Sequence, residues 1–255
     1  MQNVNEQYAS SDNLETRMSI YQFLVGPKTF PEWLTQQITP AQNIKILELG
    51  CGTGILWQEL QKSFPNCEII LSDLSKGMLE KSRENLGQTE FQYQRIDFHQ
   101  IPYPANSFEV VISNHNLYHA ADLGQVLSEI KRVLKGNGKF YTTTNSMEHL
   151  SQLRDLIDVG QLWPNRFLTS VFGTESGAAI LAKYFAQVDL RYYQNTLHID
   201  DFQIIENYLM SVRDERIHKI IEDSKDVLRK KFETRISKSG YFEIKTKAGL
   251  FTCTP

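Results

Sequence analysis

The sequence has little cysteine, no long apolar run and no marked excess of charge of either sign. Its cysteines, Cys51, Cys67 and Cys253, are too few and too scattered for a disulfide framework or a zinc site, and they suit a reducing compartment. No segment approaches the roughly 18 apolar residues of a membrane span, and the N-terminal MQNVNEQYASSDNLETR lacks a signal-peptide pattern. The net charge of −3 gives no overall attraction to nucleic acid or anionic lipid. We therefore expect a cytoplasmic protein without a membrane partner, whose overall charge does not favour nucleic acid as a partner.

The chain has 255 residues, of which 41% are hydrophobic and 22% charged, an ordinary balance for a folded globular protein. Neither an internal repeat nor a linker is visible, so we expect a single domain over residues 1–255. Amphipathic segments predict a helical N-terminal cap or lid in residues 1–40, a regular core in 41–145, and further helices with the last strands in 146–255. The sequence leaves open whether the protein is a monomer or a homodimer.

From residue 44 onward, short apolar runs alternate with segments of helical periodicity. The runs predict strands at residues 44–49, 67–74, 91–98, 108–114, 139–144 and 187–194. The periodic segments predict helices at residues 55–64, 75–86, 123–134, 149–163, 176–185, 200–212 and 217–232. Strands joined by helical crossovers form a parallel sheet covered on both faces, which is an α/β fold. Residues 241–254 alternate like a strand pair, or like one long strand with an irregularity at Gly249.

Three glycines follow the first predicted strand, at Gly50, Gly52 and Gly54 in LELGCGTGI. In parallel sheets, ligands bind beyond the carboxyl ends of the strands, where helix N-termini present unpaired backbone N–H groups. Glycine permits a positive φ there and lets the backbone approach a ligand closely. The G-x-G-x-x-G spacing of a dinucleotide-binding turn is absent, because Ile55 stands where its third glycine would fall.

The spacing that is present, Glu48-Leu49-Gly50-Cys51-Gly52-Thr53-Gly54, resembles the first motif of class I S-adenosylmethionine-dependent methyltransferases. The resemblance covers residues 44–145, and residues 241–251 match the pattern of the family's last strand. It implies a doubly wound, seven-stranded, mostly parallel sheet with an antiparallel last strand. It also implies S-adenosyl-L-methionine as the cofactor, with Glu48, Gly50, Cys51, Gly52 and Gly54 among the residues that bind it.

Asp73 ends the second predicted strand, 19 positions beyond Gly54. A carboxylate at this place can accept hydrogen bonds from both hydroxyls of a ribose, although it could also only cap the next helix. Ser75 is placed to cap that helix. The surrounding SDLSKGML is similar to the family's second motif, which implies that Leu74 and Met78 flank the adenine ring.

Other cofactor contacts are implied by the resemblance. Asp97 matches the acidic residue that accepts a hydrogen bond from the adenine amino group, and Phe98 is a neighbour for the ring. Asn114 ends the fourth strand, where the backbone of family members contacts the cofactor. The family's N-terminal segment often folds over the cofactor, which makes Tyr8 and Arg17 candidates for contacts with its methionine portion.

The alternative for the N-terminal segment is a surface helix that packs Met18 and Tyr21 on the core. The two interpretations differ in consequence, because a lid would contribute to cofactor binding and a surface helix only to stability.

Methyl transfer from a sulfonium is an in-line displacement, so the protein mainly aligns the acceptor and excludes water. A general base helps when the acceptor is a hydroxyl or a protonated amine, and histidine is the usual base near neutral pH. His115 and His119 flank Tyr118 just beyond the fourth strand, and His119 is the better candidate base. Either histidine could instead shape the loop through a backbone carbonyl. No third ligand supports a metal site.

The resemblance predicts methyl transfer to oxygen or nitrogen, with carbon also open, of a small-molecule metabolite. Methylation of RNA or protein is a second hypothesis. Against it, the sequence has no RNA-binding module and no N/D-P-P-Y/F motif after the fourth strand. A third hypothesis is a protein that binds S-adenosylmethionine without methylating anything.

Acceptor specificity is expected in residues 146–183 and 196–238. Aromatic residues in or beside these segments that can line an acceptor site are Trp163, Phe167, Phe172, Tyr192, Tyr193 and Tyr208. Glu175 can contact a cationic substrate or serve as a helix N-cap. Residues 212–250 hold 11 basic and 7 acidic residues, a pattern most often explained by a solvated helix face.

Overall fold

The computed structural model describes residues 12–87, 91–158, 164–212 and 214–255, without the side chains of residues 12–14 and 164–167. Its centre is a seven-stranded sheet in the order β3-β2-β1-β4-β5-β7-β6. β7 is antiparallel to both of its neighbours and the other pairs are parallel, which confirms the predicted fold. The strands are β1 (Lys45–Leu49), β2 (Glu68–Asp73), β3 (Gln92–Arg95), β4 (Phe108–Asn114), β5 (Leu134–Asn145), β6 (Gln187–Ile199) and β7 (Phe242–Thr254).

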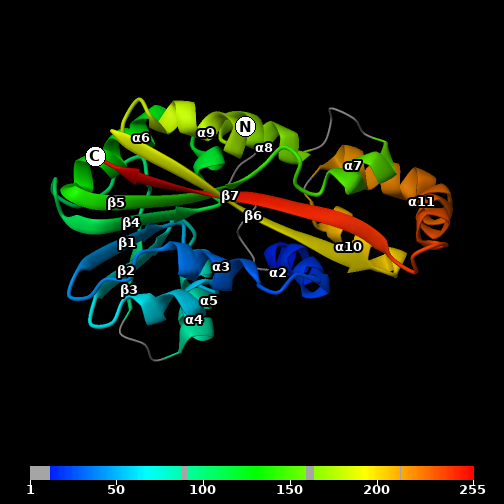
Figure 1. Ribbon diagram of the computed structural model, residues 1–255, viewed down its shortest axis with the longest axis horizontal. Helices are drawn as coiled ribbons and strands as arrows, with labels where there is room; N and C mark the ends of the chain where they lie inside the picture. The colour runs from blue at the N-terminus through cyan, green and yellow to red at the C-terminus, as the bar shows by residue number, and fades with distance from the viewer. Residues whose placement is uncertain (1–11, 88–90, 159–163, 213) are drawn as a thin grey trace.

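Helices cover both faces of the sheet, as Figure 1 shows. One face packs against α3 (Phe30–Gln37), α4 (Trp57–Leu60) and α5 (Lys76–Leu86), and the other against α6 (Leu123–Val133) and α9 (Thr174–Leu181). The buried side of α6 has the spacing i, i+1, i+4, i+7, and each side chain on it contributes roughly 1.5–3 kcal/mol on burial. These residues are Val126, Leu127, Ile130 and Val133.

β6 and β7 continue beyond the other strands as a two-stranded ribbon, at the right of Figure 1. β7 pairs with β5 only over residues 248–253, whereas its pairing with β6 runs over residues 242–254. Three helices pack on this ribbon and bury a hydrophobic cluster of their own. They are α7 (Ser151–Ile157), α10 (Phe202–Ser211) and α11 (Glu215–Ile236).

The N-terminal cap joins the ribbon end of the molecule to the sheet. It consists of α2 (Asp12–Ser19) and a 3₁₀ turn, η1 (Ile20–Phe23). α2 packs on α10, and its Glu15 forms an ion pair with Lys81 of α5 (3.5 Å). Just after η1, the Val25 N–H donates to the Thr196 carbonyl on the free edge of β6 (3.0 Å).

Within this cap the packing residue is Ile20, which is 1% exposed in the ribbon cluster. Met18, expected to pack on the core in one interpretation of the sequence, is instead 49% exposed. Tyr21 is half-buried, as expected. No helix in the described part of the chain has the length and apolar character needed to cross a membrane.

Several elements differ from the sequence prediction. Residues 55–64 form the short α4 and a 3₁₀ turn, η2 (Gln61–Ser63), because Trp57 is drawn into the core by its indole hydrogen bond to Glu48 and Pro65 stops further propagation. Helix α8 (Pro164–Val171) is present where the sequence indicates no helix. The predicted capping of α5 by Ser75 is confirmed, since Ser75 Oγ accepts from the Met78 N–H (3.3 Å).

The irregularity expected at Gly249 is wrong, because β7 is one strand whose register runs evenly through this residue on both sides. The reason for glycine here is space. A Cβ at residue 249 would lie 2.6 Å from Thr174 Cγ2 and 2.8 Å from Leu190 Cδ1.

The substitution Gly54→Ala tests how tightly the turn after β1 is packed. Gly54 has a φ of +73°, and an added Cβ would lie 2.3 Å from Ser82 Oγ. We expect the free energy of unfolding to fall by roughly 1–3 kcal/mol in urea denaturation. Gly136→Ala is the matched control, since a Cβ there meets nothing within 4 Å. Equal effects of the two substitutions would contradict this account.

Candidate active site

The carboxyl ends of β1, β2, β3 and β4 lie along one edge of the sheet, because these strands are adjacent and parallel. Strand order reverses at β1, which has β2 on one side and β4 on the other. Such a switch point opens a crevice in which α/β proteins bind ligands. The glycine turn, Asp73, Asp97 and Asn114 follow or end these four strands in turn, so the fold brings these predicted site residues to one edge.

The glycine turn presents bare backbone at this edge. Gly50 and Gly52 have φ values of +72° and +55°, in the region that favours glycine. A Cβ on Gly50 would lie 2.1 Å from Asn116 Nδ2, whereas a Cβ on Gly52 would point into open space. The Gly52 N–H donates to Asp73 Oδ2 (2.9 Å), which joins the ends of β1 and β2.

Asp73 keeps capacity to accept further hydrogen bonds. It is half-buried, and its Oδ1 accepts from the Ser75 N–H (2.8 Å). Burial raises the pKa of Asp73, although backbone N–H groups of Ser75, Gly52 and Leu74 oppose the rise. An ionised carboxylate offers about four acceptor positions, so a ligand's hydroxyl can still bond to it.

Glu48 lies beneath the turn and is 1% exposed. Its carboxylate accepts from the Trp57 indole N–H and from Asn114 Nδ2 (3.0 Å), and Thr143 Oγ1 donates to Asn114 Oδ1 (3.1 Å). Burial raises the pKa of Glu48 to about 7, although the bonds from Trp57 and Asn114 lower it. Glu48 and Asn114 therefore form one buried polar network.

Asn116 connects the glycine turn to the segment after β4. Its Nδ2 donates to the Leu49 carbonyl at the end of β1, and its Oδ1 accepts from Ser113 Oγ. The amide fills the space beside Gly50 that a Cβ would need. The residue was not singled out by the sequence, because its partner at β1 is 67 positions away.

Asp97 is held by a neighbouring histidine. Its side chain is 53% exposed, and Oδ1 accepts from the His99 backbone N–H (2.9 Å) and from His99 Nδ1 (2.7 Å). His99 Nε2 accepts from the Ala121 N–H (3.2 Å), so Nδ1 carries the proton of the neutral ring. These bonds lower the pKa of Asp97 against the opposing effect of burial.

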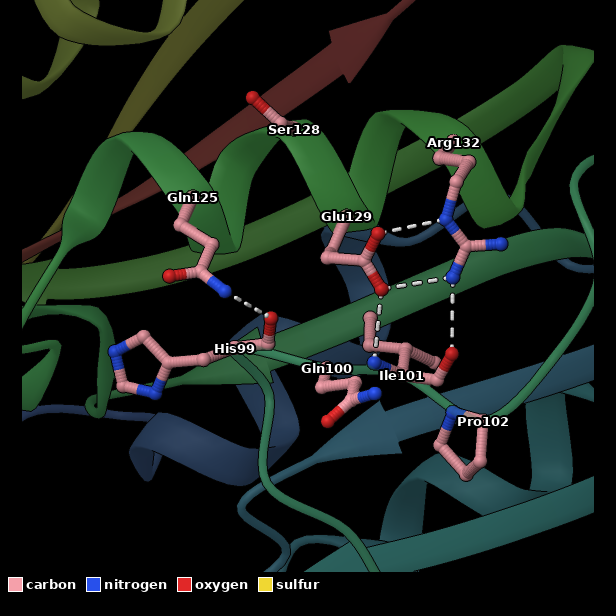
Figure 2. A pocket seen from close by; sticks show the side chains of 8 residues that line it. All are labelled: His99, Gln100, Ile101, Pro102, Gln125, Ser128, Glu129 and Arg132. Carbon is pink, nitrogen blue, oxygen red and sulfur yellow. Dashed lines mark hydrogen bonds and ion pairs between the residues drawn. The ribbon is translucent and has the colours of Figure 1, made fainter.

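The loop after Asp97 is fixed to α6, as Figure 2 shows. Arg132 donates to the Ile101 carbonyl (2.9 Å) and to Glu129, and Glu129 Oε2 accepts from the Ile101 N–H (2.9 Å). Gln125 Nε2 donates to the His99 carbonyl (2.9 Å). The polar groups along this surface groove are thus engaged with one another, and they position the segment that carries Asp97 and Phe98.

A group of aromatic side chains gathers from five separate segments of the chain near the end of β4. We call it the histidine–tyrosine cluster. Its members are Tyr21 of η1, His115, Tyr118 and His119 after β4, His149 before α7, Tyr193 of β6 and Tyr208 of α10. Arg17 of α2 lies within electrostatic range of Tyr21, His119 and Tyr208.

Direct contacts link members of the cluster. Tyr21 Oη lies 3.0 Å from His149 Nε2, and the rings of Tyr118 and His119 meet edge to face with centroids 4.6 Å apart. The Phe30 ring of α3 lies 5.2 Å from the His115 ring and 5.5 Å from the Tyr193 ring. Electrostatic influence of Tyr118, Tyr193 and Tyr208 on Tyr21 places their phenols near one another.

The backbone at two points of the cluster is unusual. His115 has a φ of +50° and Leu150, next to His149, a φ of +54°. Residues with side chains adopt this left-handed conformation at a cost of order 1–3 kcal/mol, and such residues concentrate at functional sites. His115 is held there by donation of its N–H to the Thr143 carbonyl (3.1 Å).

The cluster keeps its histidines neutral. Burial lowers the pKa of His115 to about 4, and burial with the nearby Arg17 lowers that of His119 to about 4. Burial and the nearby His115 lower the pKa of His149 to about 3. Burial raises the pKa of Tyr21 well above its ordinary value and that of Tyr208 to about 12. At pH 7 the cluster therefore presents neutral imidazoles and protonated phenols.

The central part of the sequence matches a family profile described as a methyltransferase domain, over residues 47–142. The matched region holds the glycine turn, Asp73, Asp97 and the segment after β4. Residues 47–142 thus match a methyltransferase domain, which supports the predicted class I S-adenosylmethionine-dependent methyltransferase.

Curated relatives that the chain resembles are methyltransferases. A malonyl-[acyl-carrier protein] O-methyltransferase of Legionella pneumophila is 28% identical over 177 residues, which are 62% of this chain and 61% of that protein. The ubiquinone/menaquinone biosynthesis C-methyltransferase UbiE of Desulfotalea psychrophila is 30% identical over 37% of this chain and 39% of its own. The chain thus spans less than two thirds of either relative.

Solved structures share the fold. The YcgJ protein of Bacillus subtilis aligns with a TM-score of 0.58 and 19% identity over 87% of this chain and 96% of its own. A protein of Anabaena variabilis aligns with a TM-score of 0.60 and 13% identity, covering 98% of this chain and 99% of its own.

S-adenosylmethionine, the cofactor of this methyltransferase family, fits the residues at the sheet edge. Gly52 leaves open space beside the turn, Asp73 has acceptor capacity for ribose hydroxyls, and in the described part of the chain no hydrogen bond occupies Asp97 Oδ2. We propose that these residues hold the cofactor together with Gly50, Gly54 and the Asn114 backbone. The Glu48 carboxylate, already bonded to Trp57 and Asn114, supports the turn from below.

Other predicted cofactor residues differ in their exposure. Cys51, Leu74 and Phe98 keep part of their surface accessible beside the edge, but Met78 is 2% exposed, so only Leu74 of the expected adenine pair presents a surface. Tyr8 lies outside the described residues. Arg17 lies beside His119 and Tyr208, on the cluster side of the edge.

Several acceptor-side predictions need correction. Phe172 is fully buried in the core beside Phe251, whereas Tyr192 is exposed under Lys247 and lines a surface groove rather than the cluster. Tyr193 and Tyr208 do belong to the cluster. Trp163 and the side chain of Phe167 lie outside the described residues.

The predicted N-cap role of Glu175 is wrong, because Glu175 lies in the first turn of α9, two residues beyond the N-cap. Its carboxylate accepts from Ser146 Oγ (2.6 Å) and from the Met147 N–H (3.1 Å), and Gly173 is the N-cap of α9. Glu175 therefore fixes the segment that leads from β5 toward His149.

His149 is a member of the cluster that sequence reasoning missed. Its hydrogen-bond partners, Tyr21 and Lys247, are 128 and 98 positions away, so no local spacing could mark it. The predicted helix over residues 149–163 begins only at Ser151, which leaves His149 in the turn before it.

Replacing Asp73 with alanine tests the cofactor site. We expect at least a roughly tenfold loss of affinity for S-adenosylmethionine and S-adenosylhomocysteine by calorimetry, because ribose acceptors and the bond to Gly52 are lost together. Asp201→Ala is the control, since Asp201 also accepts a hydrogen bond from the backbone N–H two residues on, that of Gln203 (2.8 Å), but lies at the start of α10. Unchanged affinity in Asp73→Ala would refute the assignment.

The variant Glu48→Gln tests the buried carboxyl through pH. The pKa of about 7 in the folded state lies above the ordinary 4.5, so protonation favours folding. This contribution to the free energy of unfolding grows as pH falls from about 8 to about 5, by up to roughly 3 kcal/mol. The wild type should therefore gain stability relative to Glu48→Gln over that interval, measured by urea denaturation.

The buried histidines have the opposite pH dependence, but they are common to both proteins and cancel in the difference. A difference in unfolding free energy that does not change with pH would show that Glu48 titrates normally.

Proposed function

We propose that this protein transfers a methyl group from S-adenosylmethionine to an oxygen or nitrogen atom of a small molecule held by the histidine–tyrosine cluster. The observation that carries the proposal is the position of the cluster. It begins at His115, directly after β4, where Asn116 ties the same segment to the glycine turn. Donor and acceptor would thus lie on either side of one short, hydrogen-bonded loop.

The cofactor supplies an activated methyl group, so the chain's own residues have to align the acceptor and exclude water. α2 and η1 pack on α10 over the cluster, and the Glu15 to Lys81 ion pair reaches across to α5. This covering supports a small acceptor over RNA or a folded protein. It also supports a lid role for α2, in which Arg17 is its charged group nearest to His119.

His119 and His115 are proposed to accept a hydrogen bond from the acceptor. With a pKa of about 4, each ring is a weak base that stays neutral across the physiological range. A weak base suffices for a hydroxyl acceptor, because an oxygen that gains a methyl while still protonated is strongly acidic. A methylated amine keeps its proton against such a base. The low pKa values therefore favour oxygen over nitrogen.

The relatives include both a malonyl-[acyl-carrier protein] O-methyltransferase and a C-methyltransferase.

A surface groove lined by Pro27, Lys28, Trp33 and residues 192–195 offers an approach to the cluster. Trp33 and Tyr193 in that groove contact Phe30, whose ring meets His115. We propose that the acceptor approaches along this row of rings.

The variant His119→Gln tests the base. Turnover should fall roughly 10²-fold with unchanged affinity for S-adenosylhomocysteine, measured with a panel of phenols, alcohols and carboxylic acids. In the wild type, kcat/KM should stay level down to about pH 5 and fall toward pH 4, since the ring gains its proton only near its pKa of about 4.

His198→Gln is the control, because His198 stacks on Tyr241 outside the cluster. An acid limb near pH 6.5, or full turnover in His119→Gln, would contradict the assignment. Binding of S-adenosylhomocysteine without methyl transfer to any compound of the panel would favour a non-methylating protein.

A further inference from the structure

In the cluster, the backbone determines the direction of the hydrogen bond between His149 and Tyr21. The Lys247 N–H of β7 donates to His149 Nδ1 (3.1 Å). Tyr21 Oη lies 3.0 Å from the other ring nitrogen, Nε2. His149 is 5% exposed, so its ring is held between strand β7 and the N-terminal cap.

Only one proton arrangement satisfies both contacts. A neutral imidazole has one N–H and one acceptor nitrogen. Because Nδ1 accepts from the Lys247 amide, the proton is on Nε2, and Nε2 donates to Tyr21 Oη. The phenol oxygen is then the acceptor in this bond, and its own O–H has to point elsewhere.

The Tyr21 O–H has no acceptor within the described part of the chain, since the hydrogen bond with His149 is the only one found for Tyr21 there. The phenols of Tyr118, Tyr193 and Tyr208 and the Arg17 guanidinium lie within electrostatic range of Tyr21. Tyr21 as a whole residue keeps part of its surface accessible. A buried or half-buried donor without an acceptor is costly, which favours a ligand that supplies one.

We propose that Tyr21, oriented by His149, donates a hydrogen bond to an oxygen of the methyl acceptor, which places a carbonyl-type oxygen beside the atom that is methylated. The inference rests on the proposed function and deepens it. His119 and His115 would receive a proton from the acceptor, whereas Tyr21 would donate a hydrogen bond to it and keep its own proton. The acceptor class is therefore an uncharged or anionic molecule with two oxygens, one of them a hydrogen-bond acceptor throughout. His149 is a positioning residue, and Tyr21 touches the substrate.

The first test is the ring tautomer, which needs no substrate. In protein labelled with ¹⁵N-histidine, NMR should show His149 neutral and protonated at Nε2 from pH 8 to pH 5. The chain has 6 histidines, and the signal missing in His149→Gln assigns it. Protonation at Nδ1, or a mixture of tautomers, would overturn the proposal even if Tyr21 variants failed to fold.

The second test uses two probes of nearly the same shape, acetophenone with a carbonyl oxygen and ethylbenzene without one. With S-adenosylhomocysteine bound, the wild type should bind acetophenone roughly three- to tenfold more tightly than ethylbenzene by ligand-observed NMR. Tyr21→Phe should lose this preference, and His149→Gln should weaken it. Tyr241→Phe, which alters a tyrosine stacked on another histidine, should keep it.

The outcomes separate the two proposals. If S-adenosylhomocysteine does not bind the folded wild type, the methyltransferase function itself fails. Two other outcomes refute only the role of Tyr21 when S-adenosylhomocysteine binds normally. In the first, the wild type binds acetophenone no more tightly than ethylbenzene. In the second, Tyr21→Phe still binds acetophenone more tightly. With an identified acceptor, Tyr21→Phe should raise KM at least roughly threefold and leave S-adenosylhomocysteine affinity unchanged.

Discussion

The side-chain amide of Asn116 is the interaction on which the site depends. It donates across the switch point to the Leu49 carbonyl and occupies the space beside Gly50 where a Cβ would otherwise lie. Strand β1 ends in a turn built for close backbone approach, and β4 ends in the segment that carries His115 and His119. One amide joins them, so the distance between a molecule on the turn and a molecule on the cluster is fixed by a hydrogen bond within the framework.

Burial sets the protonation states around this framework in opposite directions. Beneath the turn, burial raises the pKa of Glu48 to about 7, so this carboxyl group gains or loses its proton near neutral pH. In the cluster, burial keeps His115 and His119 neutral far below their ordinary pKa. A fall in pH therefore stabilises the folded state through Glu48 and destabilises it through the buried histidines, because desolvation disfavours whichever form is charged. The cluster therefore combines polar side chains with little formal charge of its own, which suits alignment better than strong acid–base chemistry.

The two halves of the site are built differently. The cofactor side consists of turns at the ends of adjacent parallel strands, whose positions follow from the sheet itself. The cluster side is assembled from η1, the segment before α7, β6 and α10, which meet only because β6 and β7 extend beyond the sheet and carry helices with them (Figure 1). A change in the ribbon or its helices can thus alter the cluster without disturbing the turns at the ends of the parallel strands.

Local periodicity and spacing in the sequence were enough to predict the α/β fold and the strand and turn at Gly50 to Gly54. They also marked Asp73 and Asp97, and these motifs together indicated the family. The sequence also brought His115 and His119 to the end of β4. Tertiary structure alone decided that His149 and Tyr21 meet, that Met78 and Phe172 are buried, that Glu175 braces Ser146, and that the register of β7 passes evenly through Gly249. These features rest on contacts between residues that are distant in the chain, and no pattern within a short window records which distant partner a side chain will find.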